Sequence, residues 1–142
     1  MQAMEISRTA LDVEWRRLEV IAGNLANANT TRTALGEPYR AMRLVSGPKT
    51  DFAQLLKGGR PNEALTGVAV YGLEPINAPA RRVYEPGNPQ ADTNGFVTYP
   101  GFDHAEEMTL MVKTARAYEA NIVAMNAARQ MYVKALDLGK KS

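Results

Sequence analysis

Few side chains in this sequence have the type and spacing that catalysis or metal binding requires. His104 is the only histidine, and the absence of cysteine excludes disulfides, thiolate metal sites and a cysteine nucleophile. Glu106 and Glu107 are adjacent, so on a helix their carboxylates diverge and do not suit a pair acting on one substrate. Gly58-Gly59 lacks the lysine and the helix that a phosphate-binding loop needs. The sequence therefore predicts no enzyme active site, no cofactor and no metal.

Two further features could carry a specific role, but each also has a simpler explanation. Met108, Met111 and Met125 follow a helical spacing, and such methionines commonly fill a core or an interface rather than form a redox site. Arg129 interrupts an otherwise apolar helical stripe. Its side chain either extends to solvent or fixes the register with a neighbouring subunit, and the sequence alone leaves both explanations open.

The composition limits the class of protein. A chain of 142 residues fits one domain with a modest core, and 45% hydrophobic with 23% charged residues is ordinary for a folded domain. The net charge is only +2 and the basic residues are scattered, so we expect no nucleic-acid partner. No apolar run approaches the roughly 18 residues of a membrane span, so membrane insertion is not expected. The N-terminal segment has no apolar core of the kind found in a cleaved signal peptide.

The strongest pattern is an apolar stripe at each end of the chain, in which the positions advance by steps of three and four. The C-terminal seam consists of Met108, Met111, Ala115, Tyr118, Ile122, Met125, Arg129, Tyr132 and Leu136. The N-terminal seam consists of Met4, Arg8, Leu11, Trp15, Leu18, Ala22 and Leu25. Such spacing predicts helices that pack as a coiled-coil-like pair. A small protein with adhesive helices at both ends suits a subunit of an assembly better than a catalyst.

These stripes predict two long helices. The first covers about residues 4–28, and the second begins after Asp103, a good N-cap, and stops at Gly139. About 35 residues at 1.5 Å each span about 53 Å, more than the roughly 37 Å diameter of a compact chain of this size. We therefore expect an elongated molecule. Expected ion pairs along the first helix are Glu5 with Arg8, Asp12 with Arg16, and Glu14 with Arg17.

The middle of the chain is rich in turns, and its prolines exclude a long helix. Strands are expected at residues 39–45, 67–74, 80–84 and 96–99, with one turn at 92–95, a short helical turn at 51–57 and a loop at 57–62. We interpret these strands as one antiparallel unit of three or four strands. The predicted fold is α+β, with residues 1–31 and 102–142 forming a terminal-helix domain and residues 32–101 a small β-rich region.

Two tracts without charge, residues 20–31 and 120–128, are rich in alanine and asparagine. Small side chains let helices approach closely, and asparagine can bond across a helix contact. A helical hairpin could bury both tracts within one subunit, but the alanines of the second tract point to several sides, so we expect neighbouring subunits to cover the rest. The residues predicted to form the helix seam and the subunit contacts are Leu11, Trp15, Leu18, Asn24, Leu25, Asn27, Asn29, Met111, Tyr118, Asn121, Ile122, Met125, Arg129 and Tyr132.

One of these tracts carries a family resemblance. Residues 22–30 (AGNLANANT) resemble the A-x-N-(I/L)-A-N-x-N-T signature of bacterial flagellar axial proteins, which comprise rod, hook and hook-associated proteins. Further motifs follow in order over nearly the whole chain and look most like the proximal-rod members of that family. They are TTRT at 30–33, PYR at 38–40, YEPGNPQAD at 84–92, NGFV at 94–97, YP at 99–100, EEM at 106–108 and ARAYEAN at 115–121.

The resemblance implies a structural, non-enzymatic protein of the flagellar basal body. It implies self-association and contacts with other rod proteins in a periplasmic drive shaft that transmits torque, after export by the flagellar type III apparatus. Such a contact joins different surfaces of each copy and builds an open helix. The alternatives are another axial component, with the short β region arguing against a hook protein, or a soluble α+β enzyme or ligand-binding module.

Overall fold

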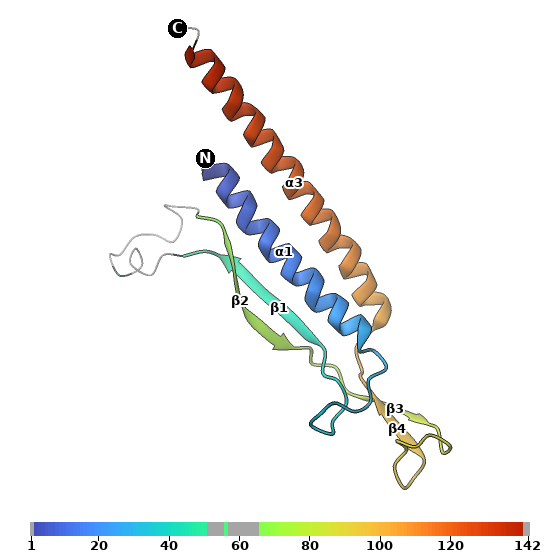
Figure 1. The fold of residues 1–142 in the computed structure, drawn as a ribbon. Coiled ribbons are helices and arrows are strands. Elements are labelled where there is room, and N and C mark those ends of the chain that lie inside the picture. The colour runs from blue at the N-terminus through green and yellow to red at the C-terminus, as the bar shows by residue number, and fades with distance from the viewer. Residues whose placement is uncertain (1, 51–55, 57–65, 141–142) are drawn as a thin grey trace.

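The computed structural model describes residues 2–50, 56 and 66–140, and it shows an elongated α+β molecule. Two long helices, α1 (Gln2–Ala26) and α3 (His104–Lys140), run side by side in opposite directions (Figure 1). The α3 helix continues well beyond the N-terminal end of α1. The predicted pair of long terminal helices with a small antiparallel β-rich middle is therefore confirmed.

The strands form two separate antiparallel ribbons. β1 (Met42–Pro48) pairs with β2 (Val68–Pro75), and β3 (Arg81–Tyr84) pairs with β4 (Phe96–Tyr99). Within the described residues the two ribbons share no ladder, so the predicted single unit of three or four strands is wrong. The β1–β2 ribbon lies along α1, whereas β3–β4 projects past the far end of the helices (Figure 1). Pro75 ends β2, and Pro79 lies in the short segment that separates it from β3.

The turn between β3 and β4 forms as predicted. The Asp92 carboxylate accepts hydrogen bonds from the backbone N–H groups of Asn94 (2.9 Å) and Phe96 (3.0 Å), and the bond from Phe96 is the main cause that lowers the pKa of Asp92. Gly95 has a φ of 80°, which other residues rarely adopt. The helical turn predicted at 51–57, apart from Leu56, and the loop at 57–62 lie outside the described residues.

Local hydrogen bonds fix the residues at which the helices begin and end. Asp103 is the N-cap of α3, as predicted, because its Oδ1 accepts bonds from the N–H groups of Ala105 (2.9 Å) and Glu106 (3.3 Å). The α1 helix ends two residues before the predicted boundary, where the Asn27 side chain donates to the carbonyl of Gly23 at 2.8 Å. The predicted stop at Gly139 is wrong, since α3 continues to Lys140. A single glycine is tolerated in a helix at a cost of only about 1 kcal/mol.

The ion pairs along α1 follow the expected spacing with one exchange of partner. Arg8 lies 2.7 Å from Glu5, and Arg17 lies 3.3 Å from Glu14. Asp12 pairs with Arg8, at 3.5 Å, rather than with the predicted residue Arg16. Because the Arg8 pairs are well exposed to solvent, they add little to stability.

The β1–β2 ribbon is held against α1 by side chains of the helix. Thr9 Oγ1 accepts a hydrogen bond from the backbone N–H of Val68 at 3.0 Å. The Thr9 side chain also lies so close to the adjacent Gly67 that a Cβ atom at this position would not fit. Arg17 donates to the carbonyl of Leu44 at 3.2 Å and to the hydroxyl of Ser46 at 2.7 Å. The β1–β2 ribbon is therefore docked on α1.

The core is small and is centred on α1, which lies between the β1–β2 ribbon and α3. Its buried hydrophobic side chains are Val13, Ile21, Ala41, Leu44 and Val97. The most buried residues of α1 are Thr9, Val13, Ile21 and Asn24. Asn24 was predicted only as one of the contact residues. None of these four residues belongs to the predicted N-terminal seam. The reason is that α1 has two partners, so its deepest face lies between them rather than along a single stripe.

Candidate assembly surface

A buried polar junction joins the two helices to the first ribbon. The Asn24 side chain is fully buried, and its Nδ2 donates to the Met42 carbonyl (2.8 Å) and to Glu107 Oε2 (3.1 Å). Its Oδ1 accepts hydrogen bonds from the Met42 N–H and the Tyr39 hydroxyl, each at 3.0 Å. Because the amide thus makes all four of its possible hydrogen bonds, Asn24 acts within the subunit. Asn24 therefore lies in the contact between the two helices, and its side chain has no hydrogen-bonding group left for a neighbouring subunit.

The charged members of this junction are Glu107 and Arg43. Glu107 is only 1% exposed, and its Oε1 lies 2.7 Å from Nη1 of Arg43. The contact is an ion pair without hydrogen-bond alignment, since that buried nitrogen has no acceptor in the right direction. Burial, and then the negative charge of Glu107, raise the pKa of the nearby Tyr39 hydroxyl. A buried carboxylate without its partner would be strongly destabilising, so the junction holds α1, β1 and α3 in one arrangement.

The central part of the predicted seam packs between α1 and α3. Trp15 and Tyr118 have their ring centroids 6.0 Å apart at an angle of 50°. The half-buried members of the predicted set are Leu11, Leu18, Leu25, Asn27, Met111, Tyr118, Asn121, Ile122 and Met125. The amides of Asn27 and Asn121 donate to carbonyls of their own helices, at 2.8 Å and 3.0 Å, and do not bridge the pair.

The remaining members of the predicted set are exposed in the single subunit. Asn29 lies in the turn that follows α1, and Trp15 is 54% exposed although it contacts Tyr118. Arg129 and Tyr132 lie on the part of α3 that α1 does not cover, and no described carboxylate lies within ion-pair distance of Arg129. These side chains are available for contacts between subunits.

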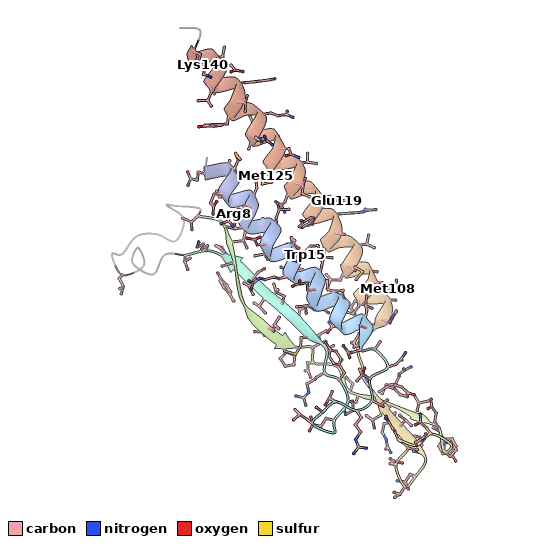
Figure 2. The ribbon with its side chains drawn as sticks, in the orientation of Figure 1. Arg8, Trp15, Met108, Glu119, Met125 and Lys140 are labelled. Carbon is pink, nitrogen blue, oxygen red and sulfur yellow. The ribbon has the colours of Figure 1, made fainter. Side chains whose placement is uncertain are left out.

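The uncovered end of α3 is unusually apolar. With 37 residues against 25, α3 is longer than α1 by 12 residues, about 18 Å at 1.5 Å per residue. We call residues 129–140 the overhang; Lys140 lies at its tip, far beyond Arg8 of α1 (Figure 2). Its exposed large apolar side chains are Met131, Tyr132, Val133, Leu136 and Leu138. Such a density of exposed apolar side chains is typical of an interaction surface.

The described residues show no metal site and no membrane-spanning helix. His104 is exposed in the first turn of α3, and the part of the chain that the structure describes contains no group of three or more side chains that could hold a metal ion. Neither described long helix has the length and apolar content needed to cross a membrane. The informative surfaces are therefore the helix pair and its overhang.

Comparison with known proteins identifies the family to which this chain belongs. Residues 4–32 match the family described as "Flagella basal body rod protein", and residues 93–138 match the one described as "Flagellar basal body rod FlgEFG protein C-terminal". The flagellar basal-body rod protein FlgC of Salmonella typhimurium is 39% identical, over 99% of this chain and 98% of its own length. This chain belongs to the FlgC family of flagellar basal-body rod proteins. The FlgC proteins of Bacillus subtilis and Borreliella burgdorferi are 35% and 31% identical, over 97% and 94% of this chain and 97% and 93% of their own.

Membership of the FlgC family confirms the resemblance that the sequence motifs predicted. The chain is a structural subunit of the flagellar basal-body rod. The other interpretations, a different axial component or a soluble enzyme or ligand-binding module, are not favoured. The two matched regions, 4–32 and 93–138, contain most of α1, the β4 strand and nearly all of α3.

Some important residues were not singled out by sequence reasoning. From the sequence, Glu107 was considered only as one of two adjacent carboxylates and as part of the EEM motif, yet it is the buried centre of the junction. A signal was present, because Glu107 lies four residues before Met111 and so falls on the face of α3 that carries the predicted seam. Arg43 and Thr9 gave no comparable signal, since their roles depend on how β1 and β2 dock against α1.

Proposed function

We propose that this chain is a subunit of the proximal part of the rod. It polymerises in the periplasm with other rod proteins, and the contacts are made by the terminal-helix region, residues 1–31 and 102–142. The small β-rich region, residues 32–101, then lies outside the helices. The protein transmits torque and carries out no catalysis.

The continuation of an apolar stripe past the end of its partner supports this proposal. Tyr118, Ile122 and Met125 are half-buried on the side of α3 that packs against α1, and the same stripe continues through Tyr132 and Leu136, which are exposed among the described residues. An apolar helix face of this kind needs a partner helix. A neighbouring subunit can supply it.

Torque transmission follows from many such contacts acting together. Within one subunit the buried junction of Asn24, Glu107 and Arg43 fixes the helices to β1, so a force on the outer ribbon reaches the inner helices. Between subunits, interlocked helices divide the load over many weak contacts. A contact between different surfaces of each copy also builds an open helix, as a rod requires.

The test of this proposal is a charge in the overhang. In cells whose only copy is Leu136→Asp, we expect a normally folded protein, no complete rods and loss of motility, because the carboxylate cannot be buried in a dry contact. The matched control is Leu35→Asp at the 89%-exposed tip of a turn outside the helix pair, which should leave motility unchanged. Normal rods in the Leu136→Asp strain would contradict the proposed role of the terminal helices.

We further propose that the chain leaves the cytoplasm through the flagellar type III export apparatus. In cells that cannot complete the rod, the protein should appear in the periplasm or the medium. Disabling only the flagellar export apparatus should abolish this release. Continued release from such cells would show that another pathway exports the chain.

A further inference from the structure

The two helices leave an aromatic groove open on one side. It has a volume of about 480 Å³ and is lined by Leu11, Asp12, Trp15, Arg16, Glu19 and Tyr118. We call it the Trp15 groove. Trp15 lies about midway along α1 (Figure 2), and its indole N–H donates to the carboxylate of Glu19 at 3.1 Å. An exposed tryptophan beside a tyrosine, held in place by its own hydrogen bond, is the type of surface that dominates binding energy at interfaces.

The overhang presents a face of matching shape. At 100° per residue, Arg129, Tyr132, Val133, Leu136 and Lys140 fall within a sector of about 100°. The face therefore has an apolar centre with one basic residue at each end. It also continues the stripe of α3 that already packs against α1 in the same subunit. The natural occupant of this face is therefore another α1 surface.

The charges of the two surfaces differ in sign: the groove carries two acids, Asp12 and Glu19, against one base, Arg16, whereas the face of the overhang carries two bases. The groove has Asp12 and Glu19 seven residues apart on α1, so they lie two turns apart, about 10 Å, on either side of Trp15. Asp12 is engaged only by an exposed contact with Arg8, at 3.5 Å, and both side chains remain accessible. Arg129 is free of described carboxylates, so it can meet such an acid on a neighbour. Pairs of this kind fix register and partner choice.

We infer that the overhang of one copy docks in the Trp15 groove of a second copy of this chain. Tyr132, Val133 and Leu136 cover the Trp15 and Tyr118 rings. Arg129 and Lys140 lie 11 residues, about 16 Å, apart along α3, and their long side chains reach inward to the two acids, which lie about 10 Å apart. Because the overhang and the groove are different surfaces, each copy can still bind the next one, and the contact builds an open chain. This inference rests on the proposed rod function and names the partner of its terminal helices.

Photochemical crosslinking tests the contact directly. A photoreactive benzoylphenylalanine at position 133, in the only copy of the protein, is irradiated in isolated basal bodies, and the crosslinked peptides are mapped by mass spectrometry. We expect crosslinks to residues 11–19. They must join two copies, since Tyr118 lies beside Trp15 and position 133 is 15 residues, about 22 Å, farther along α3. The same amino acid at Gln130 provides a second probe if the first prevents assembly.

Charge reversal supplies the matched controls. Arg129→Glu with Lys140→Glu should lower the crosslink yield about tenfold or more, as should Asp12→Lys with Glu19→Lys, and all four together should restore it. The control is Lys113→Glu with Arg116→Glu, on exposed residues of α3 outside the groove, which should leave the yield unchanged. Intact rods whose crosslinks lead only to another protein, or to another part of this chain, would overturn this inference and leave the proposed function standing. Failure of the unmodified chain to enter rods would instead contradict the proposed function.

Discussion

At the scale of single residues, the family motif has a role inside the subunit that its composition did not reveal. The tract at 22–30 suggested contacts between subunits, because asparagines in a segment without charged residues suit close helix packing. In the structure, Asn24 instead joins β1 and Glu107, and Asn27 ends α1. Two of the three asparagines in this tract that were expected at interfaces therefore make bonds that shape the subunit.

Replacing Asn24 should destabilise the fold. In Asn24→Ala, the backbone N–H and carbonyl of Met42 lose their side-chain partners inside the core, so we expect a loss of roughly 2–3 kcal/mol in the free energy of unfolding. Urea denaturation followed by circular dichroism measures this. Asn29→Ala is the matched control, because Asn29 is exposed and its replacement should cost less than about 0.5 kcal/mol. Equal stability of the two variants would show that the junction contributes little.

The junction should also be visible in the titration of Tyr39. Burial and the charge of Glu107 raise the pKa of this tyrosine, so the native state holds the proton more tightly than the unfolded chain does. The resulting stability is fully present below the unfolded pKa, about 10, and is lost as the pH rises through the higher native pKa. Absorbance at 295 nm, taken as the difference between wild type and Tyr39→Phe, isolates this group. Glu107→Gln should lower the Tyr39 pKa, and an unchanged value would remove Glu107 as a cause.

At the scale of elements, local signals located the helices and the turn well. The N-cap Asp103 and the turn at 92–95 depend on hydrogen bonds between neighbouring residues, and the structure has them as expected. The strand at 96–99 follows that turn and pairs with β3. The arrangement of the strands could not be predicted this way, because β1–β2 depends on contacts between residues as distant as Thr9 and Val68. For the same reason the stripe on α1 did not identify its buried face, which is set by two partners at once.

The overhang should be the least stable element of the monomer. A helical segment of about 12 residues that extends past α1 is marginal in water, so amides of residues 129–140 should exchange rapidly in dilute monomer. Residues 9–24 should be protected, because they contact both α3 and the β1–β2 ribbon. Hydrogen exchange with mass spectrometry, at a concentration shown to be monomeric, measures both segments. Equal protection of residues 129–140 and 110–122 would mean that the overhang is stable without a partner.

At the scale of the whole molecule, the elongated shape and the small core both follow from the long helix pair, which leaves much apolar surface exposed. Only five hydrophobic residues are buried among those described, while the two helices expose many large apolar side chains. Contacts with neighbouring subunits can bury this apolar surface, so part of the stability of such a subunit is gained on assembly. The buried junction of Asn24, Glu107 and Arg43 compensates in part, because it fixes one arrangement of the elements before assembly.

Arg129 should decide whether assembly is correct rather than whether it occurs. In Arg129→Leu, the apolar stripe of the overhang becomes longer, so helix content should be kept or raised and association should tighten. The loss of the one charge within the C-terminal seam should, however, relax the choice of register and partner, giving misassembled rods and poor motility. Swimming assays and electron microscopy of basal bodies measure the outcome, and Arg129→Lys, which keeps the charge, is the control. Normal rods and swimming in Arg129→Leu would show that the side chain only extends into solvent, and the register role would have to be abandoned.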